Sequence, residues 1–466
     1  MRKPQLPARP NLIVATCCLS VLLVGMDVTI VNVALPAIQH DIKAPISGLQ
    51  WVLDSYTVTI AGFLMLAGSL SDRFGRRLIF LCGIVIFTLG SLGCAVATSA
   101  TTLIASRGFQ GLGGSMLNPV ALSIITNTFP NGKERARALG IWSAVFGVSL
   151  ALGPLLGGLI TQTIGWRFVF LINVPIGIIA IMLVLRFVPE SKAPHSRRID
   201  KLGQILLFAT LTSLTYAIIE GPRAGWNSRT ILSSFLVAAA AFGALIPYEH
   251  RQQEPLLEVH FFRNIPFSGA TLIAASAFSG LASVLFLSAL YLQQVRAFTA
   301  FHAGLFLTPL ALAMMLCAPV SGWLVSKRGT RLSLILAGLA IVGGSLLSTH
   351  LNTTTSAGML VLSYLCFGIG IGMVNPAIST VAMSGMPMSQ SGVAAAIAST
   401  SRAIGSALGI AVSGAIVAAG RAKGMGFPEA THAVWWTIAG SGALVAILGW
   451  LTNSRWAQDS ILRQKP

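Results

Sequence analysis

The chain is a succession of long apolar runs separated by short segments that hold most of its charged residues. A run of about 20 apolar residues matches the thickness of a bilayer, and the runs predict fourteen membrane-spanning helices. The first run, Asn11 to Leu35, is too long for the apolar core of a signal peptide and lacks a clear small-residue cleavage site, so we count it as a helix. The expected helices begin near residues 13, 49, 78, 101, 136, 167, 202, 230, 268, 303, 332, 357, 394 and 433.

The composition agrees with a chain that is almost entirely embedded in a membrane. Apolar residues make up 54% of the 466 positions and charged residues 9%, whereas a soluble domain carries about 25% charge. This balance excludes an ordinary cytosolic enzyme. The net charge of +18 does not indicate nucleic-acid binding, because the basic residues fall in small clusters between apolar runs and not on one solvated face.

Those basic clusters predict the orientation of the chain. Cytoplasmic loops hold an excess of Lys and Arg, and placing the N-terminus inside puts 22 of the 31 basic residues on the cytoplasmic side, against 7 in the outer loops. The other two, Arg107 and Arg402, lie within helices. We therefore expect a multi-pass membrane protein with both termini in the cytoplasm, and as a separate expectation we place it in the bacterial cytoplasmic (inner) membrane.

Cysteine and histidine positions give no sign of a metal site. The six cysteines all lie within apolar runs without C-x-x-C spacing, and no two histidines have H-x-x-x-H spacing. No Walker A sequence, G-x-x-x-x-G-K-[ST], is present either, which argues against ATP-driven transport within this chain while leaving a separate ATPase subunit open. We expect no cofactor, no metal and no enzymatic activity.

The chain also repeats itself in three places. The matching segments are 68–77 with 322–331, 111–119 with 368–376, and Gly153 and Gly157 with Gly405 and Gly409. The offsets are 254, 257 and 252 residues. At roughly 32 residues per helix and loop, these offsets correspond to eight helices and not six.

Two six-helix halves separated by two extra helices explain such an offset. We predict an all-α integral membrane fold with an N-terminal half over residues 1–190, a linker with two extra helices over 191–262, and a C-terminal half over 263–466. Because an even number of helices is inserted, the halves run in the same direction across the membrane. Parallel halves with a substrate site between them describe one class of secondary transporter.

The first repeated segment, 68–77, reads GSLSDRFGRR. Its glycines let two helix ends approach and turn sharply, and Asp72 can pair with a nearby cation or face a helix N-terminus. These features predict a charged latch on the cytoplasmic side. The second copy has Ser326 where Asp72 stands, so any latch there is weaker.

This segment resembles the G-x-L-x-D-R-x-G-R-[KR] signature of the major facilitator superfamily. The resemblance covers the chain from about Leu22 to Trp450, and within the superfamily it points to the fourteen-helix drug:proton antiporter branch typified by EmrB/QacA-like exporters. It implies a gate that holds the outward-open state closed on the inside. The gate residues would be Gly68, Asp72, Arg73, Gly75 and Arg77. The alternative is a positive-inside topology loop alone.

Four charges lie inside predicted helices, namely Asp27, Asp54, Arg107 and Arg402. An ionisable residue within a span is costly and is by default a functional candidate. Counted along their helices at 1.5 Å per residue, the first three reach a similar depth in the N-terminal half. A desolvated carboxylate there can hold a proton and release it when Arg107 approaches or water enters, which is the chemistry of proton coupling.

The segments around these charges also resemble the antiporter branch. Segment 27–36, DVTIVNVALP, is similar to its helix 1 motif, and segment 107–113, RGFQGLG, to the helix 4 motif R-x-x-Q-G-x-G associated with proton transfer. The resemblance implies Asp27 as the proton or cation carrier and Arg107 as its tuner, with Asp54 as a second candidate. A static Asp27–Arg107 ion pair that only stabilises the fold is the alternative.

Helix 5 carries a further resemblance in segment 153–158, GPLLGG. It is similar to the antiporter motif found in exporters and not in importers of the superfamily, although Ser149 stands where a glycine is usual. Small residues at i and i+4 allow close helix packing, and a proline bends the helix. Ordinary small-residue packing is the alternative. The expected motif residues are Gly153, Pro154, Gly157 and Gly158.

Polar residues within the spans are candidates for a substrate cavity. Asn118 and Asn375 each precede a proline at matching helix breaks in the two halves, and irregular backbone that lines a cavity is typical of transporter sites. The candidate contacts are Asn32, Asn118, Asn375 and Gln293. Asn173 lies in a segment that also resembles this branch, and we expect it to shape the outer end of its helix.

These features predict a proton-coupled secondary transporter that exports hydrophobic or cationic drugs by alternating access, an antibiotic-resistance function. A carrier of a specific metabolite, such as an amino acid, sugar or siderophore, is the rival, since one fold serves many substrates. A membrane enzyme or sensor is disfavoured because metal ligands, paired catalytic carboxylates and a soluble domain are missing. The expected partners are a small-molecule substrate, protons and the lipid bilayer, and a periplasmic adaptor stays open.

Overall fold

The computed structural model of the chain is built from helices, with no strand among the residues it describes. The predicted position of both termini in the cytoplasm concerns chain ends that lie outside the described residues. The residues described are 10–129, 131–192, 199–252, 255–256, 258–384, 391–452, 454 and 457.

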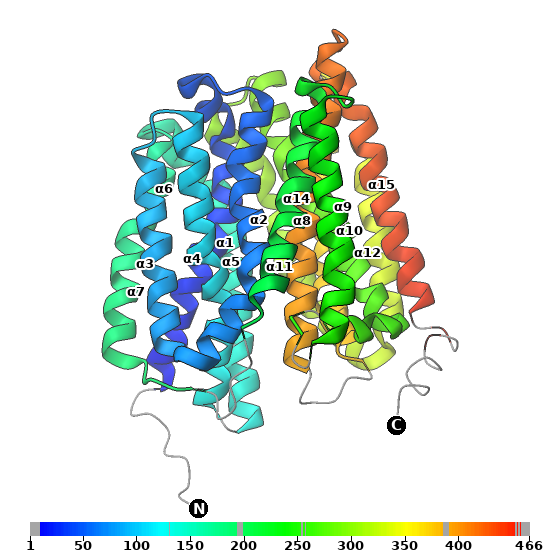
Figure 1. The fold of residues 1–466 in the computed structure, drawn as a ribbon. Coiled ribbons are helices and arrows are strands. Elements are labelled where there is room, and N and C mark those ends of the chain that lie inside the picture. The colour runs from blue at the N-terminus through cyan, green and yellow to red at the C-terminus, as the bar shows by residue number, and fades with distance from the viewer. Residues whose placement is uncertain are drawn as a thin grey trace, which may run out of the picture.

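The helices fall into three groups along the chain (Figure 1). The first group is α1 Pro10–Ile42, α2 Ile46–Phe74, α3 Arg76–Ala95, α4 Ala100–Thr128, α5 Gly132–Thr163, α6 Arg167–Leu171 and α7 Asn173–Phe187. The second is α8 Lys201–Ala224 and α9 Arg229–Arg251, followed by the 3-10 turn η1 Val259–Arg263. The third is α10 Ile265–Leu290 with the π-turn η2 Tyr291–Val295, α11 Ala300–Arg328, α12 Thr330–Ser348, α13 Ala357–Ala382, α14 Ser391–Ala422 and α15 Phe427–Leu451.

The predicted fourteen-helix membrane fold is confirmed. Thirteen helices in the described part of the chain are long and apolar enough to cross a bilayer, with α6 and α7 together forming one span. The fourteenth, α4, has 29 residues and is less apolar than the others because it carries Arg107, Gln110 and several small residues. Each span begins within six residues of its expected start.

In each half, a single glycine forms the turn between two consecutive helices, and the two turns correspond. Gly75, with φ +118°, is the single residue between α2 and α3, and Gly329, with φ +77°, is the single residue between α11 and α12. Both φ values lie in the left-handed region that L side chains rarely adopt. The repeated segments of the sequence therefore form the same sharp turn twice.

Corresponding helices also pack in the same way. Gly153 and Gly157 bring α5 so close to α1 that an added Cβ would meet Thr29 and Ile30. Gly405 and Gly409 do the same for α14, where an added Cβ would meet the backbone of Ala275 and Ser279 on α10. The sequence repeat is thus a repeat of helix contacts.

The two central helices form a separate layer. α8 packs against α2 of the first group and α14 of the third, and α9 packs mainly on α8. The predicted boundary at 190/191 falls between α7 and α8, and the boundary at 262/263 falls inside η1. The division into three domains stays a prediction.

The two halves are joined at one end of the molecule. α1 begins and α15 ends at the same end, which we call the N/C end, and the opposite end is the far end (Figure 1). Among the described residues, the side-chain hydrogen bonds that join the halves lie towards the far end. They link Gln50 to Ile410 and Ala411, Gln293 to Val33, Gln294 to Gln39, and Gln162 to Phe301.

Candidate proton-coupling site

Asp27 is the centre of a buried polar network in the N-terminal half. Its side chain is 0% exposed on α1, and Oδ2 accepts a hydrogen bond from Nη1 of Arg107 at 2.5 Å. Oδ1 accepts from Nε2 of Gln110 at 2.8 Å and from Nδ2 of Asn173 at 3.2 Å. The carboxylate is therefore ion-paired on one oxygen and held by two amide donors on the other.

Arg107 is held as completely as its partner. The guanidinium, 1% exposed, also donates from Nη1 to Oε1 of Gln110 at 2.6 Å and from Nε to the carbonyl of Val52 at 3.0 Å. Its Cζ lies 4.1 Å from the centre of the Tyr56 ring, which adds a cation–π attraction. Breaking a buried pair of this kind by removing one partner costs about 3–5 kcal/mol.

The network draws on five helices. Ser91 of α3 accepts hydrogen bonds from Gln110 at 2.8 Å and from Asn173 at 3.4 Å. Asn173, expected only to shape a helix end, therefore lies within the network at the first residue of α7. The helix is interrupted at Ile172, between α6 and α7, and this interruption places the side-chain amide of Asn173 beside Asp27.

Asp54 does not join this network. It is 0% exposed, and neither carboxylate oxygen has a hydrogen-bond partner among the described residues. It lies one turn after Gln50, on the face of α2 that Gln50 turns towards α14. Of the three charges expected at a similar depth, Asp27 and Arg107 form an ion pair and Asp54 lies apart from them.

The predicted gate loop is built mainly from contacts within the N-terminal half. Asp72 forms an ion pair with Arg76, one turn further on, at 3.3 Å. Arg77 donates from Nη2 to the carbonyl of Leu185 at 2.6 Å. The backbone N–H groups of Arg77 and Leu78 donate to the Glu190 carboxylate at 3.1 and 3.3 Å.

The gate residues therefore have partners that motif spacing does not reveal. Arg73 stacks on its neighbour Phe74, with Cζ 5.7 Å from the ring centre. An added Cβ at Gly75 would meet the Glu190 carboxylate, whereas one at Gly68 would meet open space. Glu190, beyond the end of α7, holds the start of α3 and was missed by sequence reasoning because it lies 113 residues from Arg77.

Comparisons with known proteins decide the family. The model of the Major Facilitator Superfamily matches residues 17–410. The chain belongs to this superfamily. The predicted superfamily membership is confirmed.

Its relatives include named resistance proteins. The Multidrug resistance protein Stp of Mycobacterium tuberculosis (strain CDC 1551 / Oshkosh) is 37% identical over 401 residues, which cover 86% of this chain and 74% of that protein. The Methylenomycin A resistance protein of Streptomyces coelicolor is 34% identical, over 84% of this chain and 82% of that protein. The Tetracenomycin C resistance and export protein of Streptomyces glaucescens is 34% identical, over 89% and 77%.

A solved structure has the same fold. It is a bacterial homologue of the human lysosomal transporter Spinster in an inward-facing and occupied conformation. Its TM-score against this chain is 0.67, with 97% of this chain and 98% of that chain covered and 17% sequence identity. At this identity the likeness concerns the fold alone.

In this superfamily chain, the helix 5 motif lies between the two halves. Besides the contacts of Gly153 and Gly157 with α1, an added Cβ at Gly158 would meet the backbone of Ala300 on α11. The carbonyl of Pro154 lies where a Cβ on Gly304 would stand. One face of α5 is therefore in close contact with α1 of the N-terminal half, and another face is in close contact with α11 of the C-terminal half.

The four candidate cavity residues do not come together, and the helix breaks expected at Asn118 and Asn375 are absent, because α4 and α13 continue through Pro119 and Pro376. Asn32 donates to the carbonyl of Val28 within α1, and Gln293 donates to the carbonyl of Val33 at the junction of the halves, both at 2.8 Å. Oδ1 of Asn118 is buried without a partner in the described part of the chain. Asn375 contacts Arg402.

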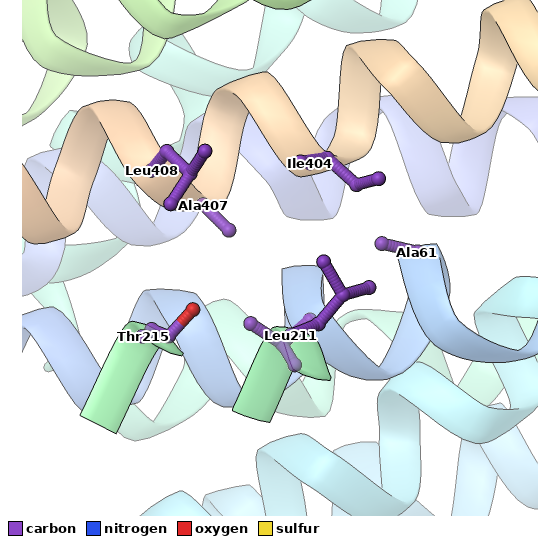
Figure 2. Close-up of a pocket in the computed structure, with 7 residues that line it drawn as sticks. Ala61, Leu211, Thr215, Ile404, Ala407 and Leu408 are labelled. Atoms are coloured by element: carbon purple, nitrogen blue, oxygen red, sulfur yellow. The ribbon is translucent and has the colours of Figure 1, made fainter. Parts of the chain in front are cut away.

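Neither of two hollows among the described residues is a drug-sized site between the halves. One of about 10 Å³ lies between α2, α8 and α14, and Figure 2 shows Leu211 and Thr215 of α8 facing Ala407 and Leu408 of α14 across it. Ligand pockets commonly measure about 300–1,000 Å³, so this cavity is a packing gap. A second hollow, of about 520 Å³, lies between α12 and α15.

Proposed function

We propose that this chain is a proton-coupled secondary transporter that exports apolar or cationic drugs across the cytoplasmic membrane. The observation that carries the proposal is the Asp27 carboxylate, buried within a span and held by Arg107, Gln110 and Asn173. Such a group exchanges a proton only when the helices around it move. Relatives named for resistance to multiple drugs, to methylenomycin A and to tetracenomycin C support drug-like cargo.

Protonation of Asp27 would act directly on helix packing. A proton on the carboxylate cancels the charge that Arg107 faces, and the remaining partners of the guanidinium, which are the carbonyl of Val52, Oε1 of Gln110 and the Tyr56 ring, carry no charge. An uncompensated charge in a span is costly. The α1–α4 contact would therefore loosen or admit water, so proton binding would favour one arrangement of the halves over another.

Asp54 is the second acidic group in this scheme. Because its oxygens have no partner in the described part of the chain, its neutral form suits the arrangement seen here. Its position on the α2 face near α14 would let it respond when the two halves separate. We propose that Asp27 is the principal carrier and that Asp54 has a supporting role.

The joined far end supports one step of alternating access. If the N/C end is cytoplasmic, as the basic residues predict, hydrogen bonds between the halves at the far end correspond to a chain that is closed on the outside. Substrate would then enter from the cytoplasm, and the loop from Gly68 to Arg77 would close that side in the opposite state. The relatives from Mycobacterium and Streptomyces support a place in the bacterial cytoplasmic (inner) membrane, and an adaptor protein is not required by the scheme. We assign the chain no enzymatic role.

Ethidium efflux from loaded cells tests the proposal, measured with and without a protonophore. The wild type should pump in a protonophore-sensitive way, and Asp27→Asn should lower the rate by about tenfold or more, because the coupling charge is lost. Asp41→Asn is the matched control, since Asp41 lies on the same helix in an exposed ion pair with Arg167. This variant should pump like the wild type.

Each other outcome has a definite meaning. If Asp27→Asn reaches the membrane in normal amounts and still pumps, Asp27 is not the carrier, and Asp54→Asn then tests the second group. If the intact protein produces no ethidium efflux, the drug-export proposal fails in favour of a carrier for a specific metabolite.

A further inference from the structure

The C-terminal half has an unusual charge content. Between Glu258 and Glu429 the sequence contains no Asp and no Glu, although five spans lie within that stretch. One basic residue, Arg402, lies near the middle of a span there, eleven residues after the start of α14. At 1.5 Å per residue this is roughly 16 Å from the helix end. No carboxylate of these five spans can therefore neutralise Arg402.

The contacts of Arg402 are to neutral groups. Its Nη2 donates to Oγ of Ser399 at 2.7 Å, and its Nη1 lies 3.5 Å from Oδ1 of Asn375 on α13. The Phe278 ring of α10 lies below the guanidinium, with its centre 5.8 Å from Cζ. No ion pair to Arg402 is formed by any residue that the structure describes.

Arg107 shows what a structural arginine looks like in this molecule. It is 1% exposed, and its charge is neutralised by Asp27. Arg402, Asn375, Ser399 and Phe278 are each only partly buried. Arg402 is therefore a cation in a span that has neither a counter-charge nor complete cover, which is the condition expected of a group that meets a ligand.

We infer that Arg402, with Ser399, Asn375 and Phe278, forms a subsite for an anionic aromatic substrate that carries a carboxylate. A guanidinium offers five N–H donors in a plane and binds a carboxylate through two parallel hydrogen bonds. Ser399 and Asn375 orient the guanidinium from two helices, and Phe278 provides an apolar surface for the rest of the molecule. The inference rests on the proposed export function and extends its cargo from cations to organic acids.

Binding of a matched pair of probes to the full-length protein tests the subsite. The probes are 1-pyrenebutyrate and 1-pyrenebutyramide, which differ in the charged group alone, measured with the protein in nanodiscs of phosphatidylcholine. The wild type should bind the acid about tenfold more tightly than the amide. Arg402→Met should remove this preference, whereas Arg402→Lys, which keeps the charge and loses the planar fork, should keep part of it.

Arg296→Met is the matched control. Arg296 also lies in the C-terminal half and also stacks on a phenylalanine, with Cζ 5.4 Å from the Phe298 ring centre, but it donates to the carbonyl of Thr355 near the far end. This variant should keep the full preference for the acid. If Arg402→Met does not fold, Ser399→Ala should lower the preference by about threefold, because one orienting contact is lost.

Three results would overturn the inference. These are equal binding of acid and amide by the wild type, an unchanged preference in folded Arg402→Met, and loss of acid binding when phosphatidylglycerol replaces part of the phosphatidylcholine. The last result would identify the occupant as a lipid headgroup and not an exported acid. Because binding needs no proton gradient, these results are independent of the ethidium assay that tests the proposed function.

Discussion

The two halves of this protein share helix packing but not chemistry. Gly157 on α5 and Gly409 on α14 make the same close helix contact, and Gly75 and Gly329 make the same turn. Yet the N-terminal half contains a buried ion pair between Asp27 and Arg107, while the position at the offset of 257 from Arg107 holds Tyr364, a neutral residue whose hydroxyl faces Ser288. The scaffold thus tolerates either a charged network or an uncharged centre at the same place.

The comparison teaches that coupling chemistry is not a requirement of the fold. A two-half transporter needs both halves to pack and to move, but if Asp27 is the proton carrier, as we propose, titrating groups in one half are sufficient for coupling. The second half is then free to present a different surface to the cargo. Experiments that treat equivalent positions of the two halves in parallel can sharpen or break this division.

The largest difference is expected at the Arg107 and Tyr364 positions. Arg107→Met leaves the Asp27 carboxylate buried without its cation, so it should abolish efflux and lower stability by about 3–5 kcal/mol. Tyr364→Phe removes a buried hydroxyl that faces Ser288 but leaves no charge unpaired, so stability should fall by only about 1 kcal/mol. Thermal unfolding in detergent and ethidium efflux measure the two effects.

A double variant separates stability from function at this site. Asp27→Asn combined with Arg107→Met removes both charges and should regain part of the stability that Arg107→Met loses, because no uncompensated charge is left. Efflux should stay absent. Recovery of transport by the double variant would contradict a coupling role and favour a pair that only stabilises the fold.

A smaller effect of the same kind is expected at the two packing glycines. Gly157→Ala places a Cβ 2.8 Å from the carbonyl oxygen of Ile30, and Gly409→Ala places one 2.7 Å from Cα of Ser279. Both should destabilise the protein by about 1–3 kcal/mol. Gly322→Ala, where an added Cβ meets open space, is the control. A large effect at one glycine and none at the other would show that the halves do not pack alike.

The smallest effect is expected at the two turn segments. Asp72→Asn removes the ion pair with Arg76, which is partly exposed, so stability should change little while the efflux rate falls by several-fold if the loop acts as a gate. Ser326→Ala removes a hydroxyl that only donates to the carbonyl of Trp323, and its rate should match that of the wild type. Equal efflux rates for the wild type and the two variants would contradict a gating role. The loop from Gly68 to Arg77 would then serve only to orient the chain in the membrane.

Much of the fold could be predicted from the sequence because a bilayer imposes it. Apolar runs must be long enough to cross, which is why the span starts were found to within six residues. The break that splits the sixth span at Ile172 was not predicted, since it lies inside an apolar run. Pro175 is a local signal for it, because a proline has no N–H to donate to the carbonyl of Leu171, but the sequence could not show that the interruption places Asn173 beside Asp27.

The candidate site was predicted only in part, for a similar reason. Asp27 and Arg107 could be found because charges within spans are rare and must be compensated. Ser91 and Asn173 are ordinary polar residues, and only the packing of five helices brings them to Asp27. Motif spacing also could not show that Asn32, Asn118 and Gln293 have separate surroundings, because that depends on how the helices are rotated against one another.

The α8 helix has a mechanical consequence for any rocking motion. It packs on α2 of one half and α14 of the other, and Gln204 hydrogen-bonds to the carbonyl of Gly62 on α2. When the halves rotate against each other, α8 can travel with only one of them, and this hydrogen bond favours α2. On the side where α2 meets α14, α14 would then also have to slide along α8, whereas on the side where α5 meets α11 no third helix of the described chain covers the contact. The two sides of the molecule would therefore resist the motion unequally.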